Sequence, residues 1–320
     1  MTRRDAGTAA ELVFRTFRRQ HLEKFLPGLA KLGLRGLPDA VAAAQYHYLS
    51  NQLGGVRVEY VYESDRKAWI RYVPPRWIWE GAAICAVPSE VSRAMLRGWH
   101  AYNGVSLGNP RLGFVCTKQT TDGQPGLEGY YLEHDRDLTP DERLRFAPGE
   151  EAPDFDPARA PRLEGAEWPR ERLRKIERNY AMDYVRNILP ELVALVGPAE
   201  ARHLGGVTAT LIGMQYYAET AASLGVTGDS AADFATYFGA MAAAQGDRVE
   251  SGKEDGATII RQTTWQLMSG VHAPHPALFD IWNGLWEGAL AVHNRRLALV
   301  VRRRLDFGDD AFEWWVRTRR

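Results

Sequence analysis

The sequence of 320 residues has few cysteines and no excess of either charge. Its two cysteines, Cys85 and Cys116, are too few for a disulfide framework and form no Cys-x-x-Cys metal motif. Lys and Arg together number 40, as do Asp and Glu, so the formal net charge is zero. A neutral chain lacks the basic surface that nucleic-acid binding requires. We therefore expect no nucleic-acid partner.

Long apolar runs and cofactor motifs are also missing. The sequence contains no run of about eighteen apolar residues, the length that a membrane-spanning helix needs. Its N-terminus lacks the apolar core of a secretion signal. There is no Gly-x-Gly-x-x-Gly loop, P-loop, Gly-x-Ser-x-Gly elbow or His-Glu-x-x-His motif. These absences predict a cytoplasmic protein without membrane contact, whose function requires no cofactor.

The hydrophobic pattern predicts an α+β fold. Apolar residues recur at helical spacing through residues 8–32, and Pro38 begins a second helix that stops at Gly54-Gly55. The period then changes to two in "VRVEYVY" and "KAWIRYV", which is typical of a β-hairpin. A helix capped by Ser89 and a second hairpin, "LGFVCTKQT" with "LEGYYLEH", complete the first half.

The second half repeats the order helices, hairpin, tryptophan segment, helix, hairpin. Ile70-Arg71 matches Ile260-Arg261, "LGFV" matches "LALV", and Asn103 is matched with Asn294 at the helix ends. Residues 136–170 are proline-rich and charged, which favours a linker or a surface arm. We predict two tandem α+β domains, 1–135 and 171–320, each with helices packed on an antiparallel sheet of hairpins. Chance similarity of two α+β layers is the alternative to an internal duplication.

The last hairpin, "LALVVRRRLDFGDDAFEWWV", carries a resemblance to a known family. With Gly308-Asp309 in its turn, it resembles the L-2-amino-thiazoline-4-carboxylic acid hydrolase-like proteins and the related 4-vinyl-reductase-type small-molecule-binding domains. Phe312 occupies the place where the family usually has cysteine. In "IRYVPPRWIWEGAAICAVPSEV", Cys85 is the candidate match for the family's other cysteine, and His272 lies at the corresponding place in the second half. The resemblance implies hydrolytic opening of a C–N or C=N bond in a ring, or plain ligand binding.

Three side chains of the first half are candidates for catalysis. Cys85 is the candidate nucleophile if the following helix lowers its pKa, and otherwise a buried structural cysteine. Glu80 follows two tryptophans in "WIWE", and aromatic walls around it would raise its pKa and suit an acid or base; the alternative is a strand with two core tryptophans and a solvated glutamate. His100 would transfer protons or be a core histidine. In a second mechanism water is the nucleophile and Glu80 the base.

Ten tryptophans and thirteen tyrosines favour a pocket with aromatic walls. His272 and His275 in "HAPH" have a metal-like spacing but no obvious third ligand, so no metal is predicted. The candidate substrate-binding residues are Trp77, Trp79, Tyr102, Tyr217, Trp265 and His272.

The sequence as a whole predicts a cofactor-independent enzyme, a hydrolase of cyclic C–N bonds, acting on a small cyclic substrate. The first alternative is a non-catalytic binding or carrier protein for a small molecule. The second is a structural protein whose second half supports oligomerisation, for example as a homodimer.

Overall fold

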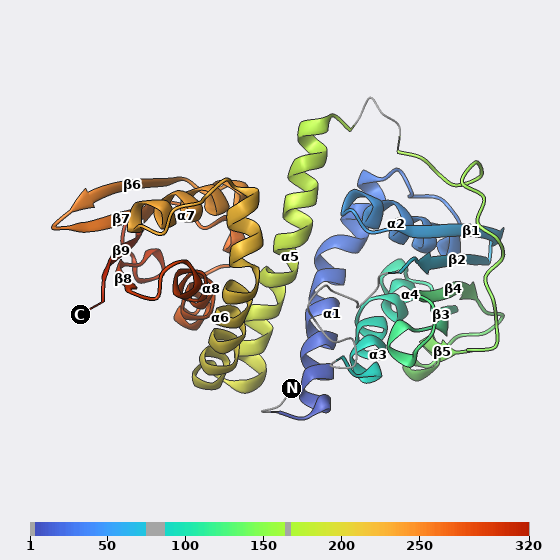
Figure 1. The fold of residues 1–320 in the computed structure, drawn as a ribbon. Coiled ribbons are helices and arrows are strands. Elements are labelled where there is room, and N and C mark those ends of the chain that lie inside the picture. The colour runs from blue at the N-terminus through green and yellow to red at the C-terminus, as the bar shows by residue number, and fades with distance from the viewer. Residues whose placement is uncertain (1–3, 75–86, 164–167, 320) are drawn as a thin grey trace. The chain divides into compact units, whose positions relative to one another are not determined.

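The computed structural model describes residues 4–74, 87–163 and 168–319. The chain divides into two compact units, Met1–Ala181 and Met182–Arg320. Each unit packs helices against a sheet of mainly antiparallel strands, so the predicted α+β fold class is confirmed (Figure 1). No helix in the described ranges carries an apolar stretch long enough to cross a bilayer.

The first unit contains a five-stranded sheet in the order β1-β2-β4-β3-β5. Neighbouring strands are antiparallel except β3 and β5, which are parallel. The principal helices are α1 (Ala6–Lys31), α2 (Asp39–Leu53), α3 (Ser89–Gly98) and α4 (Asn103–Leu107). The strands are β1 (Val58–Ser64), β2 (Lys67–Tyr72), β3 (Leu112–Lys118), β4 (Leu127–Glu133) and β5 (Leu144–Phe146).

The second unit contains an antiparallel sheet in the order β6-β7-β9-β8. Its strands are β6 (Val249–Glu254), β7 (Ala257–Gln262), β8 (Leu297–Arg303) and β9 (Phe312–Thr318). Its helices are α6 (Pro198–Ser223), α7 (Ala231–Gln245) and α8 (Pro276–His293), and α5 (Arg170–Val196) contains the boundary between the units.

Both units have the same strand register, which identifies them as copies of one plan. Arg71 of β2 lies opposite Glu128 of β4, and Arg261 of β7 lies opposite Glu313 of β9. The first hairpins agree as well, because Arg71 lies opposite Glu59 and Arg261 opposite Glu250. Since a slip of one residue would reverse every side chain between the two faces, an identical register is far more specific than a shared order of elements.

The register corrects one of the matches drawn from the sequence. Asn294 corresponds to Asn109 and not to Asn103. The side-chain Oδ1 of Asn109 accepts the N–H of Arg111 at 3.0 Å, and that of Asn294 accepts the N–H of Arg296 at 2.9 Å. Both asparagines therefore shape the turn into the third strand of their unit, β3 or β8, which is a typical role for an Asx side chain.

The segment predicted as a linker or surface arm lies, in its described part, on the first unit. Its β5 joins the sheet beside β3, and Ala160 is buried. The ammonium group of Lys118 donates to the carbonyl oxygens of Pro148 and Glu150, both at 3.0 Å. We call residues 144–163 the arm. The first unit therefore includes the arm and ends at Ala181, in α5, whereas the expected first domain ended at 135.

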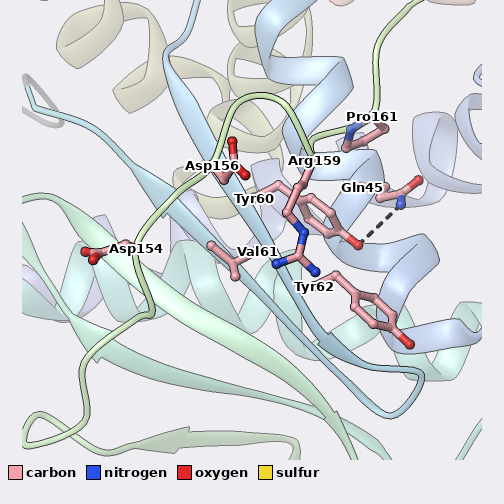
Figure 2. A pocket seen from close by; sticks show the side chains of 8 residues that line it. All are labelled: Gln45, Tyr60, Val61, Tyr62, Asp154, Asp156, Arg159 and Pro161. Carbon is pink, nitrogen blue, oxygen red and sulfur yellow. Dashed lines mark hydrogen bonds between the residues drawn. The ribbon is translucent and has the colours of Figure 1, made fainter.

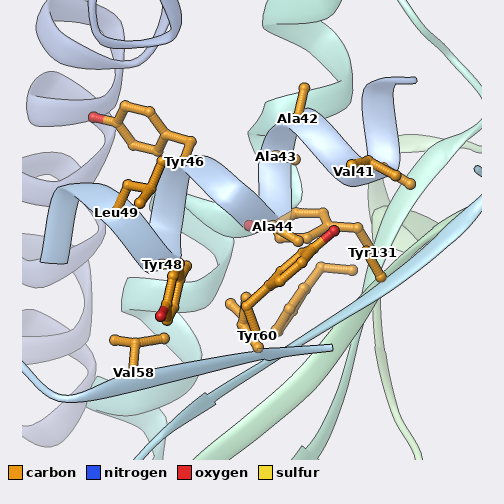
Figure 3. Close-up of a cluster of buried hydrophobic side chains, with 14 of the residues drawn as sticks. Val41, Ala42, Ala43, Ala44, Tyr46, Tyr48, Leu49, Val58, Tyr60 and Tyr131 are labelled. Carbon is orange, nitrogen blue, oxygen red and sulfur yellow. The ribbon is translucent and has the colours of Figure 1, made fainter. Parts of the chain in front are cut away.

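Each unit has its own hydrophobic core between sheet and helices. In the first unit α2 lies over the sheet, and Figure 3 shows Tyr46, Tyr48 and Leu49 on this helix with Val58 and Tyr60 on the strand beneath. The alanine run before Tyr46 lets α2 approach the sheet closely, since alanine adds little bulk and favours the helix. This close approach places one further α2 side chain, His47, inside the core.

Candidate functional site

The structure tests only some of the site residues predicted from the sequence. Trp77, Trp79, Glu80 and Cys85 fall within residues 75–86, outside the described ranges. The strand β2 ends at Tyr72, shortly before that stretch, and α3 begins at Ser89, shortly after it.

His100 belongs to a buried group of polar side chains in the first unit. We call this group, which comprises His47, Tyr72, His100, Asn103 and Tyr131, the histidine cluster. The cluster collects residues from α2, the end of β2, the turn after α3, the start of α4, and β4. His47 and His100 are each 3% exposed and Asn103 is 0% exposed. Five polar side chains that are far apart in the sequence thus share one interior location.

The two imidazoles are stacked and joined through a tyrosine hydroxyl. Their ring centroids are 4.3 Å apart with an interplanar angle of 13°. The hydroxyl of Tyr72 lies 3.0 Å from Nδ1 of His47 and 3.3 Å from Nε2 of His100. A hydroxyl has one proton and can also accept, so Tyr72 can donate to one imidazole while it accepts from the other.

The orientation of the Asn103 side-chain amide determines which atoms of this hydrogen-bond chain donate and which accept. Its Nδ2 lies 3.3 Å from Nε2 of His47 and 3.0 Å from the hydroxyl of Tyr131. If Nδ2 donates to His47 Nε2, then His47 Nδ1 carries the proton and donates to Tyr72, which donates to His100. Rotating the amide of Asn103 by 180° reverses every donor and acceptor. The cluster can therefore hold its protons in either direction, as a proton relay requires.

Burial of the cluster has two consequences for its polar groups. Burial raises the pKa of Tyr131 well above its usual value, so this hydroxyl stays protonated. The Oδ1 atom of Asn103 is buried and has no hydrogen-bond partner among the described residues. A buried amide oxygen left unpaired costs about 1–3 kcal/mol. That cost points to a donor that the described residues do not supply.

Tyr102, a predicted substrate-binding residue, lies near His100 in sequence but has other neighbours. The guanidinium carbon of Arg18 lies 3.5 Å from the centroid of the Tyr102 ring, and His21 meets the ring edge-on at 5.5 Å. The Nε2 of His21 pairs with the hydroxyl of Ser106 at 2.8 Å. Burial, reinforced by Arg18, lowers the pKa of His21 to about 3. His21 is thus a neutral core histidine at physiological pH.

The predicted residues of the second unit are not brought into one site. Tyr217 is buried, and its hydroxyl lies 2.5 Å from Nδ1 of His293. Trp265 belongs to a different group, in which its ring meets Phe279 and Phe312 edge-on and Trp282 at a tilt. His272 is exposed on the loop before α8. Exposure of the "HAPH" loop leaves His272 without the enclosed setting that a pocket-lining role needs.

The other cysteine of the chain, Cys116, lies in the core on β3. Burial raises the pKa of its thiol to about 12, so the thiol stays protonated at neutral pH and cannot act as a nucleophile. No group of three or more potential metal ligands occurs among the residues that the structure describes.

A cavity of about 380 Å³ opens between β1, α2 and the arm. Figure 2 shows the hydrogen bond of 3.3 Å from Gln45 Nε2 to the Tyr60 hydroxyl at one side, with Asp154, Asp156 and Arg159 supplied by the arm. Successive helix residues are turned by about 100°. Gln45 and His47 therefore project from nearly opposite sides of α2, and the cavity and the histidine cluster are separate sites.

Comparison with known proteins does not assign this chain to a family. No family model matches the chain, and no curated protein is significantly similar. A subunit 3 of the trafficking protein particle complex from Naegleria fowleri, covalently bound to palmitic acid in its crystal structure, is 17% identical with a TM-score of 0.38. The match covers 46% of this chain and 97% of that one. Similarity this low supports no inference about fold or function, and the resemblance to the hydrolase-like family stays a prediction.

Of the histidine cluster, only His100 was predicted from the sequence as a site residue, and the other four members were not. A signal for His47 is present in "QYHYLSNQ", where His47 and Asn51 lie four residues apart on a helix otherwise rich in alanine. The structure places both in the interior, and Asn51 Nδ2 donates to the carbonyl oxygen of His47 at 2.7 Å. Tyr72 and Tyr131 each look like ordinary strand residues, because alternation gives the face of a side chain but not its neighbours across the core.

Proposed function

We propose that the first unit binds a small cyclic molecule and that the histidine cluster transfers protons in a cofactor-independent reaction on it. Hydrolysis of a ring C–N or C=N bond is the reaction class to test first. The observation that carries this proposal is the pair of stacked imidazoles, both joined to the hydroxyl of Tyr72. An imidazole can accept a proton at one ring nitrogen while the other carries one, which suits it to acid–base catalysis.

The relay gives each member a defined task. One imidazole would accept the proton of an attacking nucleophile, while the other would return a proton to the leaving nitrogen. The Tyr72 hydroxyl connects the two, so a proton gained at one ring can be balanced by a proton lost at the other. Water or Cys85 would be the nucleophile, and Glu80 would assist as acid or base. Such pairing of acid and base typically contributes factors of 10² to 10⁴ in rate.

Asn103 supplies the second support for a ligand. In the orientation of the amide that the structure shows, its buried Oδ1 atom has no partner among the described residues, and an N–H or O–H group of a substrate would satisfy it. A cyclic amide or amidine carries such a donor on the ring. A ligand of this kind would therefore recover part of the free energy lost by burying the amide oxygen.

Variants of the relay test the proposal. The chain would be screened against cyclic amides, amidines and thiazolines by thermal shift, and turnover of each stabilising compound would be measured. We expect Tyr72→Phe to lower kcat at least tenfold while retaining binding, and His100→Gln to lower it further. His21→Gln, which alters a buried histidine outside the cluster, is the matched control and should retain turnover. Equal activity of Tyr72→Phe and the unsubstituted chain would contradict the relay.

Labelling with a mild thiol reagent and a Cys85→Ser variant separate the two nucleophiles. Rapid labelling of Cys85 in the folded chain, together with loss of turnover in Cys85→Ser, would support covalent catalysis. Full activity of Cys85→Ser would assign the attack to water.

The cavity beside β1 favours a second candidate function, the non-catalytic binding of a small zwitterion. Arg159 could hold a carboxylate, Asp154 and Asp156 an ammonium group, and Tyr60 the apolar part of the ligand. The volume of about 380 Å³ is within the range typical of small-molecule sites. Here Arg159→Ala should abolish the thermal shift given by free amino acids, whereas His100→Gln should leave it unchanged.

A further inference from the structure

The two sheets differ at one edge. In the first unit, β3 is covered by β5 of the arm, which pairs with it in parallel from Phe114 opposite Leu144 to Cys116 opposite Phe146. The corresponding strand of the second unit, β8, is the last strand of its sheet in the described part of the chain. It carries the apolar sequence "LALVV" and then two arginines. An uncovered strand with such a sequence is a ready site for pairing with another strand.

The outer faces of the two sheets differ in the same way. In the first unit a row of Trp69, Tyr130 and Val115 is at most 5% exposed, and Ala147 and Ala152 of the arm pack on it. The same register in the second unit produces a row of Ile259, Trp315 and Val300. Trp315 and Val300 are only partly buried. The second sheet thus repeats the surface that the arm covers in the first.

The two sheets also correspond in the positions of their basic residues. Lys118, opposite Glu128, contacts Glu151 of the arm at 2.6 Å. At the equivalent position, opposite Glu313, the second unit has Arg303, which is exposed and forms a solvent-exposed ion pair with Asp310 at 2.9 Å. An ion pair this exposed contributes little free energy, so a partner carboxylate can replace Asp310. The guanidinium carbon of the preceding Arg302 lies 4.9 Å from the centroid of the Trp315 ring. Arg302 and Arg303 therefore lie at the positions where, in the first unit, Lys118 meets the carboxylate of the arm.

We propose that the edge of β8 and the adjoining face of Trp315 bind an extended acidic segment of a partner protein, which adds a strand parallel to β8. The segment would place apolar side chains where Leu144 and Phe146 lie on β3, followed by carboxylates that meet Arg302 and Arg303. Main-chain hydrogen bonds would supply affinity and the side chains selectivity, as in other cases of strand addition.

The backbone groups that would pair are identified by the register. The carbonyl oxygen of Cys116 accepts the N–H of Ala147 at 2.9 Å, so Cys116 directs its backbone groups toward the arm. Both third strands have a bulge, between Cys116 and Lys118 and between Val301 and Arg303, which places Val301 in the position of Cys116. Val301 therefore directs its backbone N–H and C=O to the uncovered edge.

A labelled peptide with the sequence of residues 139–153, which contains β5 and both glutamates of the arm, tests the proposal with the full chain. Fluorescence anisotropy should show saturable binding that weakens as salt rises. Val301→Pro removes the outward N–H without affecting a bond to β9, and it should weaken binding about tenfold or more, by loss of backbone pairing. Replacing Glu150 and Glu151 of the peptide by glutamine should weaken binding about two- to fivefold.

Charge variants of the chain keep the test valid if Val301→Pro fails to fold. Arg303→Glu should weaken binding several-fold, whereas Arg35→Glu, an equal change of charge on an exposed residue of the first unit, should not. Binding that is unaffected by both Val301→Pro and Arg303→Glu would place the peptide elsewhere and overturn the proposal. A chain that dimerises, and becomes monomeric on Val301→Pro, would assign the edge to a second copy and overturn it as well.

Discussion

The two units have the same strand register but different side chains in their cores. His47 of α2 and Phe238 of α7 each lie eight residues before a glycine with positive φ, Gly55 and Gly246, that follows the helix. His47 stacks on His100 inside a polar group, whereas Phe238 packs 4.0 Å from Trp286 and 4.8 Å from Trp314, centroid to centroid. At this position the first core contains the hydrogen-bonded histidine cluster, and the second contains packed aromatic rings.

The difference teaches that strand register and core chemistry are specified separately. Tyr131 of β4 lies opposite Phe114, and its counterpart Val316 of β9 lies opposite Leu299. Replacing valine with tyrosine changes none of the backbone bonds. Burying a polar group costs free energy unless it is paired, so the histidine cluster carries a cost that Phe238 and Val316 avoid at the corresponding positions of the second unit. A function for the histidine cluster gives a reason for that cost.

The largest loss of stability is expected when a large side chain is removed from the aromatic core of the second unit. Trp286→Ala removes a side chain that is 0% exposed, and it should lower the free energy of unfolding of the second unit by about 3–5 kcal/mol. Hydrogen exchange measured at increasing urea would resolve the two units. Protection in α2 and β4 should not change. Equal loss in both units would show that they do not unfold separately.

Exchanging the two core residues compares the units directly. His47→Phe removes the partner of Tyr72 and Asn103, and it should destabilise the first unit by about 1–3 kcal/mol. Phe238→His places an imidazole among tryptophans and should destabilise the second unit by a similar amount. Urea unfolding with hydrogen exchange measures both. A stabilised first unit in His47→Phe, with turnover or ligand binding lost, would show that the cluster is kept for function.

Acid should weaken the first unit through His21. Because the pKa of His21 is about 3 in the folded chain and the ordinary pKa of an exposed histidine is about 6.5, the unfolded chain binds more protons between these values. Stability from this group is complete above pH 6.5 and falls as pH drops, by about 1.4 kcal/mol per unit. His21→Gln should flatten that slope in urea unfolding at pH 4 to 7. An unchanged slope would assign acid sensitivity to other groups.

The smallest effect concerns a turn that the units share. Asn109→Ala and Asn294→Ala each remove the acceptor for the backbone N–H of Arg111 or Arg296. Each should cost its unit about 0.5–1.5 kcal/mol. Thermal or urea unfolding of each variant measures the loss. A cost confined to one unit would mean that the shared geometry no longer serves the same purpose in both.

Much of the fold could be predicted from the sequence, since local periodicity reports local structure. The alternation in "KAWIRYV" and "RLALVV" predicted strands, and the Ile-Arg pairs at 70–71 and 260–261 predicted that the two halves share one order of elements. The histidine cluster could be predicted only at His100, because its other members look like ordinary helix and strand residues. Asn294 was matched to the wrong asparagine because helix ends resemble one another more than strand registers do.

By itself the sequence determined two α+β halves, their order of elements and the charged, proline-rich nature of residues 136–170. These properties depend on neighbours in the chain, and periodicity and composition encode them. The tertiary structure was needed to show that His47, Tyr72 and Asn103 join His100, that the arm covers β3, and that no described residue pairs with the outer edge of β8. Contacts between distant segments depend on register and on the close approach of α2 to the sheet, which no local pattern encodes.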